Sequence, residues 1–295
     1  MSGECPRLGV VTVTYNSSRV LADFLRSSLA QTLPDFKIYA IDNASGDDTV
    51  ARLRAERDSR LVVVANPDNR GVAEGNNQGT RLALADGCSH VLLLNNDTVF
   101  APDLFASMLE IAVRGGHPVL VPKIYYHDRP DRIWCAGGRF LPSRGYPGVH
   151  FGEGEVDTGQ FDQDRAIEYS PTCCMLIDVS VFTRVGMMDP KYFVYYDDTD
   201  FCLRLRHAGI EIWYAHQPVL YHKVGSLTGG ETSPFGARMG ARNKVYYLRK
   251  HFGPVRITWL LSWYLAYVLL RRISGKDSQA IFRIKMKAFS EGLRL

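Results

Sequence analysis

Four short apolar runs, each leaving through polar residues, constrain the fold of this chain more than any other feature. The runs are Leu8–Tyr15, Lys37–Asp42, Leu61–Ala65 and Val91–Leu94, and segments typical of helices begin between them near Ser18, Val50 and Gly71. Strands that alternate with helices are typical of a parallel sheet covered by helices. The sequence therefore predicts an α/β fold whose ligands bind at the carboxyl edge of the sheet.

The pattern becomes irregular in the second half of the chain. A helix over 102–114 and a strand over 119–124 precede residues 125–170, which are rich in Gly, Pro, Asp and aromatic residues and where we expect substrate-shaping loops. Further strands are expected over 173–179 and 211–215, and short helices over 180–185 and 198–208. From Ser233 onward the chain is predicted to be helical.

Positive charge is concentrated at the C-terminal end. Residues 238–295 contain 13 Lys and Arg residues but only Asp277 and Glu291 as acids, so this segment carries +11 while the whole chain carries +4. A basic segment that also carries aromatic residues indicates an anionic membrane surface at least as strongly as nucleic acid. Nothing in residues 1–237 resembles a nucleic-acid module, and we expect no nucleic-acid partner.

The apolar part of this basic tail, Ile257–Leu270, has 14 residues and is too short to cross a bilayer as a helix. Trp259, Trp263 and Tyr267 recur every four residues within it, between flanking arginines. This pattern predicts a helix that lies in the membrane interface. The alternatives are a helix packed on the rest of the chain or on a second subunit in a homo-oligomer.

The six cysteines form no Cys-x-x-Cys pair, which argues against a zinc site and for reduced thiols. Met1–Val13 has no basic start followed by an apolar run, so we expect no secretory signal and a cytoplasmic protein.

Two polar clusters could carry chemistry. Asn95-Asn96-Asp97 leaves the fourth strand and offers oxygen ligands for Mg²⁺ or Mn²⁺ with a diphosphate, although the same residues could simply form a turn. Asp197, Asp198 and Asp200 follow the aromatic run Tyr192–Tyr196. They could cap a helix, or one of them could have the raised pKa of a general base.

Two other nucleotide-binding folds are disfavoured. The first strand leaves through Thr14-Tyr15-Asn16 and lacks the G-x-G-x-x-G of a dinucleotide-binding domain, and there is no P-loop.

Farther along, His222 follows a strand-like run; an isolated histidine is usually structural but can also bind Mn²⁺.

Six ordered motifs resemble those of the family 2 inverting glycosyltransferases with the GT-A fold. They are Thr12–Asn16, Asp42–Thr49, Asn69–Gly79, Leu94–Thr98, Tyr196–Arg204 and His222–Ser226. The resemblance covers about residues 7–252 and is nearest to the rhamnosyltransferase-like and galactofuranosyltransferase-like branch, which builds bacterial surface polysaccharides. It implies a Rossmann-like, mostly parallel sheet flanked by helices, with a catalytic domain over 1–232 and a C-terminal helical extension over 233–295. Residues 1–100 would form the nucleotide-sugar half and 101–232 the acceptor half.

The resemblance also implies roles for the matching positions. The donor-binding residues would be Thr14, Tyr15, Asn16, Asp42, Asn43, Asn69, Gly71, Asn76, Asn95 and Asn96. Asp97 and His222 would bind the metal, Mg²⁺ or Mn²⁺, and Asp198 would be the catalytic base.

Two positions depart from the family pattern. Asn95 replaces the first Asp of the metal-binding Asp-x-Asp, and a neutral amide binds a divalent cation less well than a carboxylate. Asp197 stands where many members have Glu. Asp197, Trp134, Cys173 and Cys174 are acceptor-site candidates, although core packing is the simpler interpretation of the cysteines.

These expectations describe an inverting glycosyltransferase at the inner face of the cell membrane, which passes a sugar to a lipid-linked or polysaccharide acceptor. dTDP-rhamnose is the first donor that the resemblance implies, and UDP-sugars follow. A non-catalytic nucleotide-sugar-binding subunit is an alternative that Asn95 leaves open, although Asp97, Asp198 and His222 argue against it. A nucleotidyltransferase would need a Gly-rich, basic phosphate loop, which Thr12–Ser18 lacks.

Overall fold

The structure is a computed structural model that describes residues 7–225 and 233–295. Its described residues form a ten-stranded mixed sheet in the order β10-β12-β6-β11-β4-β1-β2-β3, with β5 paired to β12 and β7 to β6. The strands are β1 Leu8–Thr14, β2 Phe36–Asp42, β3 Leu61–Ala65, β4 His90–Leu94, β5 Thr98–Phe100, β6 Val119–Tyr126, β7 Ile133–Cys135, β10 Arg165–Ile167, β11 Cys174–Asp178 and β12 Ile212–His222. Strands β8 (Gly138–Phe140) and β9 (Gly148–His150) form a separate hairpin.

Helices cover both faces of the sheet, so the predicted α/β fold is confirmed. They are α1 Ser18–Leu29, α2 Thr49–Ala55, α3 Gly71–Ala85, α4 Leu104–Gly115, α5 Val179–Val185, α6 Asp197–His207, α7 Pro234–His251, α8 Pro254–Ile273 and α9 Gln279–Gly292. One core lies under α1, α2 and α4 and includes Phe24 and Phe105. The other lies under α3, α5 and α6 and includes Phe182 and Phe201.

The first half of the sheet matches the sequence prediction. Strands β4, β1, β2 and β3 are all parallel, and Thr14 at the end of β1 lies beside Asp42 at the end of β2. Helix α3 approaches β1 closely because it carries two glycines on the packed face. A Cβ atom on Gly79 would lie 2.4 Å from Val11 Cγ1, and one on Gly75 would lie 2.7 Å from Val13 Cγ2.

The second half differs from the prediction in three ways. Strand β11 is antiparallel to both β4 and β6. Strand β12 runs to His222, well beyond the expected end at Ala215. Its pairing with β6 is interrupted after Ala215 and resumes at Val219, and the residues between them, His216-Gln217-Pro218, look like a loop in the sequence. Five of the strands described above were not predicted: β5 and, within the residues expected to form loops, β7, β8, β9 and β10; each has only three residues.

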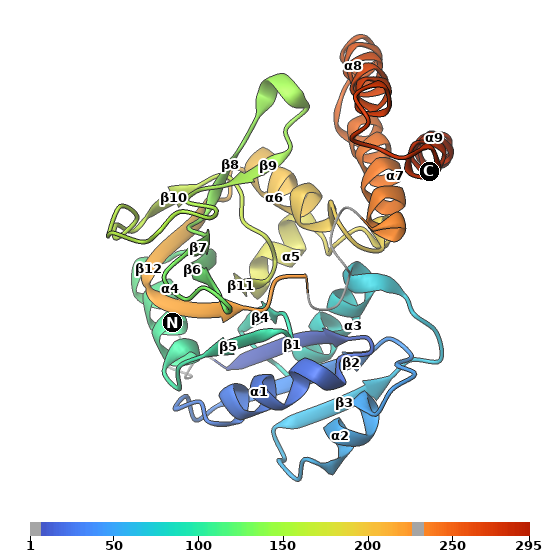
Figure 1. Cartoon of the computed structure of the whole chain (residues 1–295). Coiled ribbons are helices and arrows are strands. Elements are labelled where there is room, and N and C mark those ends of the chain that lie inside the picture. Colours follow the sequence, from blue (N-terminus) through green and yellow to red (C-terminus); the bar gives the residue numbers. More distant parts are fainter. Residues whose placement is uncertain (1–6, 226–232) are drawn as a thin grey trace.

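The C-terminal helices gather on one side of the molecule, as Figure 1 shows in orange to red. Tyr246, Tyr247 and Leu248 of α7 join the core that lies under α6, while Val245 and Ala288 form a small core between α7 and α9. No helix among residues 7–225 and 233–295 is long and apolar enough to cross a membrane. Of the motif residues, Ser226 lies outside the described residues, as does Cys5.

Candidate active site

The exits of β1 and β2 are tied together by one buried carboxylate. Asp42 is fully buried, and its oxygens accept hydrogen bonds from the Thr14 hydroxyl at 2.9 Å, the Ser45 amide at 2.9 Å and the Ser45 hydroxyl at 2.5 Å. Asn16, in the left-handed region at φ 50°, accepts from the Gly46 amide at 2.8 Å, while Tyr15 is 48% exposed. These bonds fix the first loops at the sheet edge and leave an aromatic ring open to a ligand.

The start of α3 joins the same edge. Buried Asn43 donates to the Gly71 carbonyl at 2.9 Å, and Asn69 accepts from the Gly71 amide at 2.9 Å. Gly71 has φ +81°, and a Cβ there would lie 2.4 Å from the Phe193 carbonyl, so this turn requires glycine. Asn76 is buried, with its amide nitrogen 3.6 Å from the Met188 sulfur. The expected donor residues of β1, β2 and α3 therefore converge.

Asp97 and His222 meet at the exit of β4. His222 at the end of β12 pairs with Thr98 of β5, and its Nε2 lies 3.1 Å from Asp97 Oδ1; both side chains are buried. Asn96 donates to the Val13 carbonyl, and the Asn95 amide donates to the Cys173 carbonyl at 2.9 Å. The carbonyl oxygen of the Asn96 side chain and His222 Nδ1 are buried without a hydrogen-bond partner among the described residues.

This donor set fits a divalent cation in part. A carboxylate and an imidazole in contact are suitable ligands for Mn²⁺ or Mg²⁺, which commonly take the rest of their ligands from substrate phosphates and water. No group of three His, Cys, Asp or Glu side chains that could hold a metal occurs within residues 7–225 and 233–295. The structure thus brings together the two residues implied as metal ligands and offers no third one of these types.

Asp198 lies in the first turn of α6, on the wall of a cavity of about 350 Å³. Its carboxylate accepts hydrogen bonds from the Tyr169 hydroxyl at 2.9 Å and the Thr199 amide at 2.6 Å. Burial raises the pKa of Asp198 above its ordinary value, and these bonds partly oppose the rise. Burial and the neighbouring Asp198 charge also raise the pKa of Asp197. A carboxylate with a raised pKa beside a cavity can act as a general base.

The C-terminal helices also line this cavity. The small residues Gly236, Ala237, Gly240 and Ala241 of α7, Tyr264 of α8 and Lys285 of α9 line it. Packing of the tail on the rest of the chain, one of the three alternatives for this segment, is therefore present. The tail also contributes directly to the candidate site.

A chain of rings connects the two halves of the site. Trp134 of β7 lies edge-on to His222 with ring centres 4.4 Å apart, and His150 of β9 lies 4.9 Å beyond Trp134. His150 in turn stacks on Tyr169 at 5.9 Å, and Tyr169 donates to Asp198. Sequence reasoning missed His150 and Tyr169, for which the only signal was the aromatic content of residues 125–170.

The two cysteines have the surroundings of core residues. Cys173 and Cys174 are buried in the core under α4, and the Cys174 thiol lies 3.8 Å from the Met108 sulfur. Burial raises the pKa of both thiols, which keeps them uncharged. These surroundings agree with the packing interpretation, whereas Trp134 faces the Asp97–His222 pair.

Comparison with known proteins identifies the family. Residues 9–186 match the model of Glycosyl transferase family 2. The chain belongs to this family. A crystal structure of S. aureus TarS residues 1–349 superimposes with a TM-score of 0.61 at 15% identity, covering 98% of this chain and 80% of that one. The mannosyltransferase PcManGT from Pyrobaculum calidifontis, solved with GDP-Man and Mn²⁺, gives 0.58 at 14% identity over 99% of this chain and 85% of its own. The fold is the GT-A fold of glycosyltransferases, as the motifs implied.

Among curated relatives, an N-acetylglucosaminyl-diphospho-decaprenol L-rhamnosyltransferase of Mycobacterium tuberculosis is 26% identical and covers 88% of this chain and 90% of its own. A dTDP-rhamnosyl transferase, RfbF of Shigella flexneri, is 24% identical over 84% of this chain and 82% of its own. An uncharacterized protein of Sinorhizobium fredii is 27% identical over 84% of this chain, which spans 28% of that longer protein. This family 2 member is a glycosyltransferase that uses a nucleotide-sugar donor.

Proposed function

We propose that this protein is an inverting glycosyltransferase that moves rhamnose from dTDP-rhamnose to a hydroxyl of a lipid-linked or polysaccharide acceptor in bacterial surface glycan synthesis. The observation that carries the mechanism is the half-buried Asp198 side chain, with its raised pKa, on the wall of the cavity. The relatives from M. tuberculosis and S. flexneri, whose names specify rhamnosyl transfer, support the choice of sugar. The first of these names also supports a lipid-linked acceptor.

In the proposed reaction, Asp198 accepts the proton of the acceptor hydroxyl as that oxygen attacks the anomeric carbon. The nucleoside diphosphate leaves from the opposite face of the sugar, so one displacement inverts the configuration and no enzyme nucleophile is required. The Tyr169 hydroxyl and Thr199 amide hold the carboxylate in orientation. Thr14, Asn16, Asp42 and Asn43 fix the loops against which the nucleotide would bind, while Asn69 and Gly71 shape the adjacent turn.

Asp97 and His222 are the proposed ligands of Mg²⁺ or Mn²⁺. When bound, such an ion would offset the charge that develops on the departing diphosphate. Asn95 would support it only weakly, because an amide oxygen is a poorer ligand than a carboxylate. Asn95 also favours the second candidate function, a non-catalytic nucleotide-sugar-binding subunit. A UDP-sugar donor is the alternative within the same reaction.

We further propose that the protein works on the inner face of the cell membrane, held there by the basic C-terminal helices. Their +11 charge would attract anionic lipids, and α8 exposes Trp259 and Trp263 by 51% and 62%. This location would suit a lipid-linked acceptor, because the same helices form a wall of the cavity beside Asp198. Association into a homo-oligomer through α8 is the competing use of this face.

The donor proposal is tested by thermal stabilisation with dTDP, UDP and GDP, each with and without Mn²⁺. A nucleotide at 100 times its Kd should add about 2.7 kcal/mol to the free energy of unfolding. We expect the largest shift with dTDP, an increase with Mn²⁺, and loss of the Mn²⁺-dependent part in Asp97→Ala. Absence of a shift with all three nucleotides would contradict the donor site, and an unchanged Mn²⁺ effect in Asp97→Ala would remove Asp97 from the metal site.

A further inference from the structure

The loop that leads into the catalytic helix is strained. Phe193, Tyr195 and Tyr196 have φ angles of 67°, 64° and 67°, in the left-handed region that residues with side chains rarely adopt. They stand immediately before Asp197 and Asp198, so the direction in which α6 leaves this loop decides where Asp198 lies. Conformations of this kind persist only where surrounding contacts determine them, and they cluster at functional sites.

One end of this loop is held by the donor side of the molecule. The Val72 amide at the start of α3 donates to the Phe193 carbonyl at 2.6 Å. The glycine at position 71 is what allows this contact, since a side chain there would collide with Phe193. The loop is therefore joined to the turn that is expected to bind the nucleotide diphosphate.

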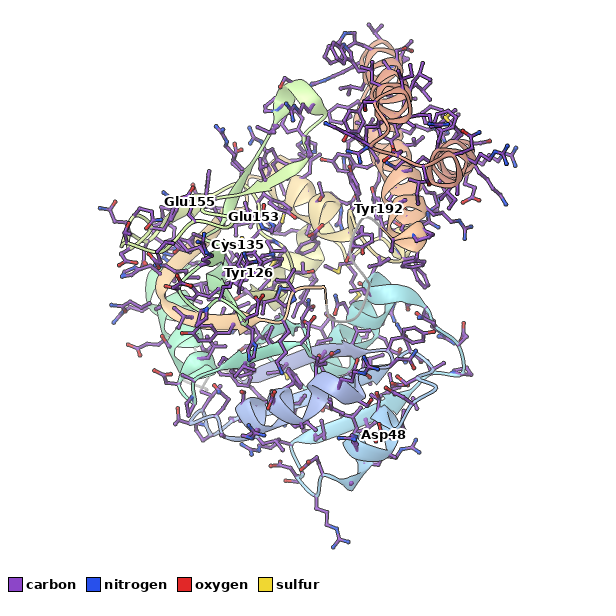
Figure 2. All side chains as sticks on the ribbon, viewed as in Figure 1. Asp48, Tyr126, Cys135, Glu153, Glu155 and Tyr192 are labelled. Carbon is purple, nitrogen blue, oxygen red and sulfur yellow. The ribbon has the colours of Figure 1, made fainter. Side chains whose placement is uncertain are left out.

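The other side of the loop is held by side chains of α7, among them one fully buried asparagine. Asn243 is fully buried, and its amide nitrogen lies 2.8 Å from the Tyr192 carbonyl, 2.7 Å from that of Val194 and 2.9 Å from that of Tyr195. The neighbouring Arg242 donates to the Lys191 and Tyr192 carbonyls at 2.6 and 2.8 Å. Figure 2 labels Tyr192, which lies where the body meets α7. These donors supply hydrogen-bond partners to the carbonyl groups of this irregular backbone, of which the Tyr192 carbonyl also accepts from the Val194 amide at 2.8 Å.

The end of α7 holds α6 itself. Asp200, fully buried in the first turn of α6, is 2.8 Å from His251 Nε2 and 2.8 Å from Lys250 Nζ, both near the end of α7. Within α6, Arg204 also pairs with it at 2.8 Å. Helix α7 thus contacts the segment around Asp198 on both sides, through Asn243 before it and through His251 and Lys250 after it.

We propose that Asn243 is a positioning residue for sugar transfer, which holds the strained 192–196 loop so that Asp198 points into the cavity. The proposal rests on the proposed function of Asp198 as the base. Helix α7 also supplies the small residues that line the cavity, from Gly236 to Ala241. Helix α7 therefore fixes both this part of the cavity wall and the position of Asp198. Transfer would then depend on the C-terminal helices even where they touch no substrate.

The test compares Asn243→Ala with Val245→Ala, a matched control. Val245 is also fully buried on α7, but it packs in the small core with α9 and lies against Gly292, away from the loop. In Asn243→Ala we expect kcat to fall by about 10- to 100-fold because the base is misplaced, while the Kd for the donor nucleotide stays within about twofold. Val245→Ala should lose stability with little change in kcat. Arg242→Gln, a milder change on a half-buried side chain, should give an intermediate loss.

Hydrogen–deuterium exchange supplies a readout that does not depend on the reaction. Amide exchange over residues 192–200 should rise in Asn243→Ala and stay unchanged in Val245→Ala. Unchanged exchange in this loop, or equal losses of kcat in Asn243→Ala and Val245→Ala, would overturn the proposal. If wild-type protein bound nucleotide but transferred no sugar, the proposed function would fail, while the exchange experiment would still decide whether Asn243 holds the loop.

Discussion

Two adjacent carboxyl groups share the start of α6, and their environments differ. Both have a pKa raised by burial, but Asp198 also accepts hydrogen bonds from Tyr169 and Thr199 and is favoured in its charged form by His150. The hydrogen bonds from Tyr169 and Thr199 therefore favour the charged form of Asp198 against the effect of burial. Because both folded-state pKa values exceed the unfolded ones, this pair lowers the free energy of unfolding as pH rises through the raised values.

The environment of Asp198 predicts the pH dependence of transfer. As the proposed base, Asp198 accepts a proton only when it is ionised, so kcat should rise with pH through its raised pKa. Tyr169→Phe removes a hydrogen bond that favours the charged carboxylate, which raises the pKa of Asp198 further and should move this rise to higher pH by about one pH unit. The pH profile of kcat measures it. The exposed Asp128→Asn serves as the control, and an unchanged or downward shift in Tyr169→Phe would contradict the assignment.

Only part of the site could be predicted from the sequence. Asp97 and Asp198 stand next to segments with clear strand or helix patterns, so their places in the fold follow from local order along the chain. Tyr169, His150 and Asn243 belong to the site through contacts that join residues 16 to 88 positions apart in the chain. These contacts are Tyr169 to Asp198, Asn243 to Tyr195, His150 to Trp134, and Trp134 to His222. Such contacts have no signature within a short sequence window.

At the scale of elements, α8 presents two different faces. Leu260, Tyr264 and Val268 are buried against the other helices. Along the opposite face lie Val255, Trp259, Trp263, Leu270 and Ile273, exposed by 86%, 51%, 62%, 63% and 73%. Arg256, Arg271 and Arg272 accompany them on the same helix. An apolar face with aromatic residues between cationic ones is the pattern of a helix that lies in a membrane interface.

This face predicts binding to anionic vesicles. The protein should sediment with liposomes that contain phosphatidylserine at low salt. This binding should weaken as the salt concentration rises, because salt screens the attraction between charges. Trp263→Ala should reduce the bound fraction several-fold, whereas Phe235→Ala, a comparably exposed aromatic on α7, should not. Liposome binding that changes neither in Trp263→Ala nor with salt would contradict the proposal that α8 binds the membrane. A dimer in solution that Trp263→Ala dissociates would also contradict it.

Elements were predictable where their signal is local. The strands and helices of the first half follow apolar runs and spacing, and α3 was predicted to begin at its observed first residue, Gly71. The antiparallel direction of β11 and the addition of β5 to β12 depend on how the chain returns across the sheet. A run such as Cys174–Asp178 carries no information about direction, so these features could not be predicted.

At the scale of the whole molecule, the C-terminal helices are predicted from the sequence as an extension of the catalytic domain, but in the structure they form part of the candidate site. The sequence separates them by charge, +11 in residues 238–295 against an acidic remainder. In the fold they pack on α6, anchor the 192–196 loop and line the cavity beside Asp198. The basic segment would thus bring the membrane, the acceptor and the catalytic base to one side of the molecule.

The proposed mechanism depends on Asp198 as the base of an inverting transfer from a nucleotide sugar. The most direct measurement is NMR of the product formed from dTDP-rhamnose and an acceptor hydroxyl, for wild type and Asp198→Asn. We expect a product whose anomeric configuration is opposite to that of the donor, and a loss of transfer of at least about 100-fold in Asp198→Asn with nucleotide binding retained. Retention of the donor's configuration, or turnover in Asp198→Asn within a few-fold of wild type, would contradict the proposed mechanism.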